Sequence, residues 1–220
     1  MVRKSEMTEM IIDINAVRDP LLSQLASALY ERFPQLISLA FFGSRVAGEP
    51  DEHSDYDVLL ILPEGLAWKE RGKAELDLER QFGVRLQLVV TSPRGVEFYT
   101  RLEPSFRFWL KEAVILGKAE ILNGDLPPVA RQGCLGSLLE AELDLEEAQE
   151  ETTLDERGRN YYRILRKILI VKGVIEGDYS YAWLREELRK LLGERWIALL
   201  RQPGAHFSRE EVETITDIVR

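Results

Sequence analysis

The strongest constraint on the fold lies in residues 39–62, where two apolar segments flank a glycine-containing turn and a charged loop. Leu39–Phe42 has the composition of a buried strand, and Gly43-Ser44 follows it directly. Tyr56–Leu62 is apolar except at Asp57, which is typical of a strand buried on both faces. The stretch therefore predicts two strands, with polar groups gathered where the first ends and the second begins.

Two acids mark the start of the second predicted strand. Successive strand side chains alternate between faces, so Asp55 and Asp57 project from the same side and can converge on one site. Acids at the start of a buried strand cost free energy unless a cation compensates them. Carboxylate oxygens suit Mg²⁺ or Mn²⁺, and one cysteine and two histidines offer little to a softer metal. The spacing predicts a divalent-metal site at these two aspartates.

The turn after the first strand has the features of a phosphate-binding segment. Gly43 lets the backbone come close to a ligand, and N–H groups at the start of a short helical turn attract phosphate oxygens. Ser44 adds a hydroxyl donor. The stretch lacks the Gly-Lys-Ser/Thr ending of a P-loop and the GxGxxG of dinucleotide-binding folds, so it fits neither of those mechanisms.

The combined pattern of Gly43-Ser44, ten residues and Asp55-Tyr56-Asp57 resembles the signature of the DNA polymerase β-type nucleotidyltransferase superfamily. A Gly-Ser turn or an Asp-x-Asp loop alone is common in proteins, but their joint spacing between two apolar strands is rarely accidental. In that family the serine holds the nucleotide's terminal phosphates, and the two acids hold the metals. The resemblance implies that Gly43, Ser44 and Arg45 bind nucleotide, while Asp55 and Asp57 bind metal and are catalytic.

The next predicted strand, Val84–Val90, departs from the family pattern. The superfamily usually carries a third acid there, and the Leu-Val-Val that follows aligns that position with Gln87. A glutamine cannot accept a proton from an attacking hydroxyl. Three interpretations stay open: the base comes from elsewhere, the enzyme works without one, or the site binds nucleotides without transferring them.

Composition limits the partners and the location. The net charge of −9 and a pI near 5.0 argue against a nucleic-acid backbone as partner. No apolar run approaches the length needed to span a membrane, and the polar start is not a signal peptide. We expect a cytoplasmic protein without a nucleic-acid or membrane partner. The sequence leaves the oligomeric state open, a homodimer included.

The periodicity predicts an α+β fold: an N-terminal mixed β-sheet with flanking helices, followed by a C-terminal helical bundle. A cluster of turn-forming residues at 123–128 places the boundary between a catalytic domain of residues 1–125 and an acceptor-binding domain of residues 126–220. Helical patterns cover Pro20–Phe33, Trp68–Phe82, Gly133–Glu151, Asn160–Ile175, Ser180–Leu192 and Ser208–Val219, with Gly193 ending the fifth and Ser208 and Glu211 forming a capping box on the last.

Two segments give weaker signals. Residues 97–109 hold five aromatic side chains in an irregular segment broken by Pro104, which favours a core role over base stacking. Residues 114–122 predict one short edge strand. The helix at 133–151 carries an apolar stripe expected to be its buried face: Leu135, Leu138, Ala141, Leu145 and Ala148.

The acidic helix bears on the reaction. Residues 137–156 hold nine acids and no base, which is typical of a solvated face or, alternatively, of a wall that receives a cation. A catalytic domain followed by a helical bundle resembles the kanamycin-type antibiotic nucleotidyltransferases. That resemblance implies transfer of a nucleoside monophosphate from an NTP, expected to be ATP, to a hydroxyl of a small and cationic acceptor. Glu142 is then the candidate base, with Glu140 and Asp144 beside it.

Two alternatives stay open. Nucleotidyltransferases that act as antitoxins modify a protein, so the acceptor could be a protein hydroxyl that becomes AMPylated. The chain could also be a catalytically lapsed nucleotide-binding regulator, an interpretation that depends on Gln87 in place of the third acid.

Overall fold

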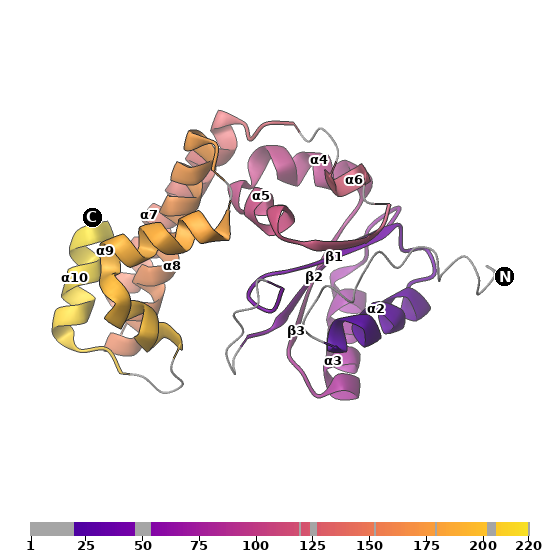
Figure 1. Ribbon diagram of the computed structural model, residues 1–220, viewed down its shortest axis with the longest axis horizontal. Helices are drawn as coiled ribbons and strands as arrows, with labels where there is room; N and C mark the ends of the chain where they lie inside the picture. The colour runs from indigo at the N-terminus through magenta and orange to yellow at the C-terminus, as the bar shows by residue number, and fades with distance from the viewer. Residues whose placement is uncertain are drawn as a thin grey trace. The chain divides into compact units, whose positions relative to one another are not determined.

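The computed structural model describes residues 20–46, 54–118, 120–123, 127–151, 153–178, 180–201 and 206–219. The described residues form two compact units, one within 1–99 and 112–127 and the other within 100–111 and 128–220. Figure 1 shows a sheet flanked by helices and a separate set of helices, so the predicted α+β fold class is confirmed. No described helix combines the length and apolar character required to traverse a lipid bilayer.

The first unit is built on a mixed four-stranded sheet. Its strands are β1 (Ser38–Phe42), β2 (Tyr56–Ile61), β3 (Leu86–Thr91) and β4 (Val114–Gly117). Their order is β3-β2-β1-β4, with β1 antiparallel to both β2 and β4, and β2 parallel to β3. The two central strands are β1 and β2, so the end of β1 and the start of β2 lie between the two outer strands.

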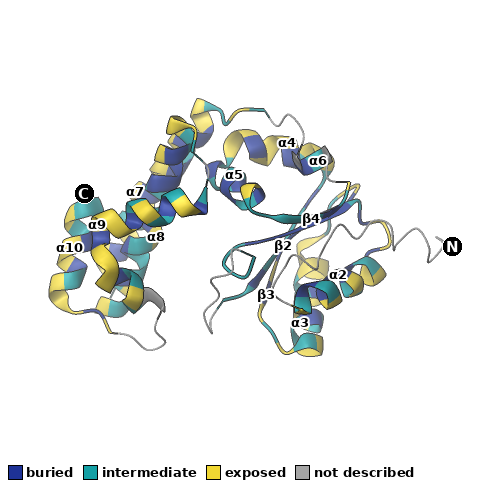
Figure 2. Ribbon diagram, viewed as in Figure 1, coloured by how far each residue is buried: buried dark blue, intermediate teal, exposed yellow. Residues whose placement is uncertain are grey.

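Helices α2 (Leu21–Arg32) and α3 (Trp68–Phe82) pack on one face of this sheet. Leu25 and Leu29 of α2 and Leu78 of α3 are buried with Phe41 and Leu60 from the strands. Figure 2 shows that α2 and α3 each carry both buried and exposed residues. Both helices were predicted. The predicted stop of α3 is also confirmed: Gly83 adopts the left-handed conformation, and its N–H donates to Glu79 O.

The aromatic segment is more regular than the sequence suggested. It forms helices α4 (Pro93–Leu102) and α5 (Pro104–Lys111), because Pro104 opens the second helix, where its missing N–H costs nothing. Phe106 and Phe108 are fully buried, as the core interpretation predicted, whereas Phe98 is exposed. The strand predicted over 114–122 is confirmed only as β4, because residues 120–123 form the short helix α6 (Glu120–Asn123).

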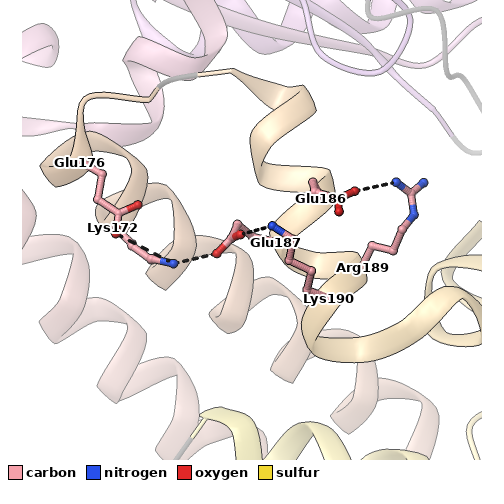
Figure 3. A network of polar contacts seen from close by, with 6 residues as sticks. All are labelled: Lys172, Glu176, Glu186, Glu187, Arg189 and Lys190. Carbon is pink, nitrogen blue, oxygen red and sulfur yellow. Dashed lines mark hydrogen bonds and ion pairs between the residues drawn. The ribbon is translucent and has the colours of Figure 1, made fainter.

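The second unit is helical. Besides α5 it contains α7 (Arg131–Glu150), α8 (Leu154–Glu176), α9 (Tyr181–Arg201) and α10 (Arg209–Val219). Its core is formed by α8 with α9 and α10, as the buried side chains of Leu165, Leu184, Trp196 and Ile215 indicate. Lys172 of α8 and Glu187 of α9 are 2.7 Å apart, in a network of ion pairs that continues along α9 (Figure 3).

Several predicted helix boundaries shift. Helix α8 begins at Leu154 rather than Asn160, because Thr153 caps it by accepting the Glu156 N–H. Gly193 leaves the helical conformation as predicted, but a further helical segment follows it to Arg201. The predicted capping box is confirmed, since Ser208 Oγ accepts from Glu211 N and Glu211 Oε2 accepts from Ser208 N.

The predicted buried stripe of α7 was partly wrong. Ala141 and Ala148 are buried, but Leu135 and Leu138 are exposed. The helix places its small residues against α8, which lets the two backbones come close. Periodicity cannot distinguish that packing from the usual one, in which the largest apolar residues face the core.

Candidate active site

Gly43 and Asp57 lie against each other at the end of β1. The antiparallel register pairs Phe42 with Asp57, which brings the aspartate beside the turn that follows β1. Gly43 has φ of +80°, a conformation that favours glycine. A Cβ placed on Gly43 would overlap Asp57 Oδ2 and lie 3.1 Å from its Cγ. The glycine therefore leaves the space that the Asp57 carboxylate fills.

Asp55 and Asp57 flank Tyr56, which is buried in the core beneath the sheet. Because side chains alternate along a strand, Asp57 leaves the opposite face from Tyr56, and Asp55, which directly precedes β2, is expected on the same face as Asp57. Both are partly accessible to solvent. Two carboxylates at the start of a central strand are a suitable donor set for a hard divalent cation.

Arg85 is a residue that the sequence analysis missed. Its Nε lies 2.9 Å from Asp55 Oδ1, with the two side chains 54% and 42% exposed. This oxygen is shielded from solvent, and it receives no well-aligned hydrogen bond. The contact is thus an ion pair with imperfect geometry. The contact follows from the register of the structure: β2 and β3 are parallel, and Arg85 precedes Gln87 by two residues as Asp55 precedes Asp57.

Gln87 lies beside Asp57 in the sheet. The parallel pairing of β2 with β3 places the two residues in register, so their side chains leave the same face. Leu86 and Leu88 are buried on the other face, and Gln87 is exposed. Within the described part of the chain, no three His, Cys, Asp or Glu side chains cluster as a metal site. An amide therefore occupies the position next to the second aspartate.

Arg45 links the glycine turn to the start of β2. Its Nε and Nη2 donate to the Ser54 carbonyl at 3.1 and 3.0 Å, and its guanidinium lies 4.4 Å from the centre of the Tyr56 ring. This cation–π contact and the paired hydrogen bonds fix the guanidinium. Ser44 follows Gly43 in the same turn and is partly exposed.

The acids proposed as general bases lie on α7 in the second unit. Lys167 of α8 pairs with two of them, at 2.7 Å from Asp144 Oδ2 and 3.5 Å from Glu140 Oε2. Burial lowers the pKa of Lys167, but the hydrogen bond to Asp144 and the charges of both acids outweigh it and leave that pKa raised. Glu142 is exposed. Two of the three candidates are thus already neutralised by a lysine.

A cavity of about 440 Å³ opens in the second unit, between α7, α8 and α10. Arg157, Tyr161 and Arg209 are among its lining residues, with Glu213 and Asp217 supplying the opposite charge. None of the predicted site residues lines it.

The sheet order, the glycine turn and the paired aspartates fit a nucleotidyltransferase domain. Residues 22–119, from α2 to just beyond β4, match the family model described as nucleotidyltransferase domain. This segment is thus a nucleotidyltransferase domain, in agreement with the DNA polymerase β-type superfamily that the sequence motif indicated.

Solved structures that match part of the chain include toxin–antitoxin proteins. One, a toxin–antitoxin with AMP-PNP, is 17% identical over 42% of this chain and 69% of that chain, with a TM-score of 0.35. Another, a mutant of the MntA-HpeT toxin–antitoxin, is 16% identical over 57% of this chain and 89% of that chain, with a TM-score of 0.37. No curated protein matches the chain.

Proposed function

We propose that this chain transfers a nucleoside monophosphate from ATP to a hydroxyl of a small cationic acceptor and releases pyrophosphate in the cytoplasm. The nucleotidyltransferase domain supplies the general class of reaction. The single observation that carries the proposal is the packing of Asp57 against Gly43, in the turn that also contains Ser44. We assign nucleotide transfer to residues 1–125 and acceptor binding to residues 126–220.

Asp55 and Asp57 are the residues that would hold Mg²⁺ or Mn²⁺, and such an ion would stabilise negative charge on the reacting phosphate. Gly43 admits the Asp57 carboxylate, and Ser44 presents its hydroxyl to the terminal phosphates. Arg45 holds the turn against Ser54, which keeps Gly43 and Ser44 in place. Asp55 would exchange its imperfect ion pair with Arg85 for the cation.

Because residue 87 is a glutamine, it supplies no carboxylate beside Asp57 to accept the proton of the attacking hydroxyl. Glu142 is the proposed base because it is exposed, whereas Glu140 and Asp144 pair with Lys167. A lysine already occupies the carboxylates of Glu140 and Asp144, whereas that of Glu142 is solvated. Its role is tested by Glu142→Gln, with Glu140→Gln as the matched control on the same helix.

The test is pyrophosphate release from each of the four NTPs, with a panel of amino-substituted hydroxyl compounds as acceptors. We expect pyrophosphate release that requires Mg²⁺ and occurs with one class of acceptor. We expect Asp57→Asn to abolish this release. Asp77→Asn is the matched control, because Asp77 pairs with Arg32 between α3 and α2. Release that persists in Asp57→Asn would contradict the proposal. Intact-mass measurement distinguishes a small-molecule acceptor from a protein acceptor. A mass increase of one nucleotide on a protein would show that the acceptor is a protein hydroxyl.

A second candidate function is a nucleotide-sensing regulator that binds without transfer. Gln87 favours it, because an amide stands where an acid would complete the set with Asp55 and Asp57. Metal-dependent nucleotide binding without pyrophosphate release, across all acceptors, would support this function and exclude the first.

A further inference from the structure

An apolar row runs along the solvent face of α7. Leu135, Leu139 and Leu143 follow one another at intervals of four residues, so they lie on one side of the helix. They are 48%, 60% and 59% exposed. The opposite side, with Ala141 and Ala148, is buried. This helix therefore points three of its large apolar side chains away from its own core, which is costly in water unless another surface covers them.

Acids continue the same solvent face toward the end of the helix. Glu147 extends the four-residue spacing, and Glu146 and Glu150, three and seven residues after Leu143, lie on the same side; all three are exposed. Within the described part of the chain, no lysine or arginine pairs with these three side chains. The acids of α9 differ, because Glu186 and Glu187 are neutralised by Arg189, Lys190 and Lys172 (Figure 3).

We propose that this face of α7, defined by Leu135, Leu139 and Leu143 with Glu146, Glu147 and Glu150, docks a helix of another protein. The partner helix would carry an apolar row flanked by lysine or arginine residues. An apolar row beside uncompensated acids matches a helix of this kind in both shape and charge. A second copy of α7 is a poor occupant, because residues 137–156 contain nine acids and no base to compensate them.

The test measures binding of two synthetic helical peptides to the full chain by fluorescence anisotropy. The two peptides have the same length and the same apolar row. In one peptide lysines flank this row, and in the other glutamates do. We expect the lysine-flanked peptide to bind at least about tenfold more tightly. The double variant Leu139→Gln with Leu143→Gln is expected to weaken its binding by about tenfold or more. Ile175→Gln, an equally conservative change at an exposed position of α8, should leave binding unaltered.

Folding is checked in the same samples by chemical unfolding, whose midpoint should change little because the leucines are exposed. Equal binding of both peptides, no binding of the lysine-flanked peptide, or binding unaffected by the double variant would overturn the proposal. Sedimentation of the chain without peptide tests whether a second copy binds this face instead. A dimer that becomes monomeric in the double variant would show that the leucine row is a homodimer interface. The readout is peptide binding, so the result does not depend on whether the chain transfers nucleotides.

Discussion

Gly43 and Asp57 are in contact across the antiparallel pair β1 and β2, and only a residue without a side chain fits between the turn and the carboxylate. Gly43→Ala is therefore expected to displace Asp57 and abolish nucleotide transfer. The left-handed backbone adds a stability loss of about 1–2 kcal/mol. Pyrophosphate release and urea unfolding measure the two effects.

Gly65→Ala is the matched control for this substitution. Gly65 has nearly the same φ, +78° against +80°, but no atom lies within 4 Å of its added Cβ. Both variants should lose similar stability, and only Gly43→Ala should lose transfer. Equal loss of activity in the two variants would show that backbone strain, rather than the displaced carboxylate, explains the effect.

Arg85→Gln tests the ion pair at Asp55. Both side chains are about half exposed, so the substitution should change the free energy of unfolding by less than about 1 kcal/mol. The substitution should raise the affinity for Mg²⁺ several-fold in the presence of nucleotide. The reason is that Mg²⁺ would no longer have to displace the Arg85 guanidinium from Asp55. Calorimetric titration measures this affinity. A weaker affinity would mean that Arg85 itself contacts the phosphates.

Gln87→Asp restores an acid in register with Asp57. Without metal the two carboxylates repel, so the melting temperature should fall; Mg²⁺ should reverse that fall. If Gln87 limits proton removal, transfer should also rise by about tenfold or more. Thermal scans with and without Mg²⁺ provide the first readout. A melting temperature that does not respond to Mg²⁺ would contradict the placement of the metal at these aspartates.

Much of the first unit was predictable because the local sequence patterns for strands, helices and helix ends agree with its tertiary structure. Leu39–Phe42 and Tyr56–Ile61 are apolar enough to be central strands, and Gly83 ends α3 as its conformation requires. The alternation rule predicts Asp55 and Asp57 on one face, and the register confirms that Asp57 lies beside Gly43 at the end of β1. Arg85 was not predicted, because its contact depends on the pairing of β2 with β3, which the sequence pattern does not specify.

Helix α7 shows the opposite case. Its sequence contains both a row of leucines and a row of small residues, and periodicity favours burial of the larger ones. The structure buries Ala141 and Ala148, because close approach to α8 offsets the smaller apolar area of each alanine. Such a choice depends on the shape of the neighbouring helix.

Asp155 gives a pH prediction for the second unit. Its side chain accepts the Phe207 N–H at 2.7 Å and contacts His206 Nδ1 at 2.6 Å. The backbone hydrogen bond from Phe207, followed by that from His206, lowers the pKa of Asp155. A lowered carboxyl pKa stabilises the fold above the unfolded value, near 3.9, and the contribution is lost as pH falls through the folded pKa.

Asp155→Asn should accordingly cost about 1 kcal/mol at pH 7 and progressively less as pH falls below about 4. Asp217→Asn, at an exposed position of α10, should cost little at either pH. Urea unfolding of both variants and the wild type at pH 7 and pH 3 measures the difference. A cost for Asp155→Asn that is the same at both pH values would contradict the assignment.

The most direct measurement is calorimetric titration of the full chain with a non-hydrolysable ATP analogue, with and without Mg²⁺, in the wild type, Asp57→Asn and Asp77→Asn. We predict binding that needs Mg²⁺, is weakened about tenfold or more by Asp57→Asn and is unchanged by Asp77→Asn. No detectable binding by the wild type, or binding that is indifferent to both Mg²⁺ and Asp57→Asn, would contradict the proposed nucleotide site.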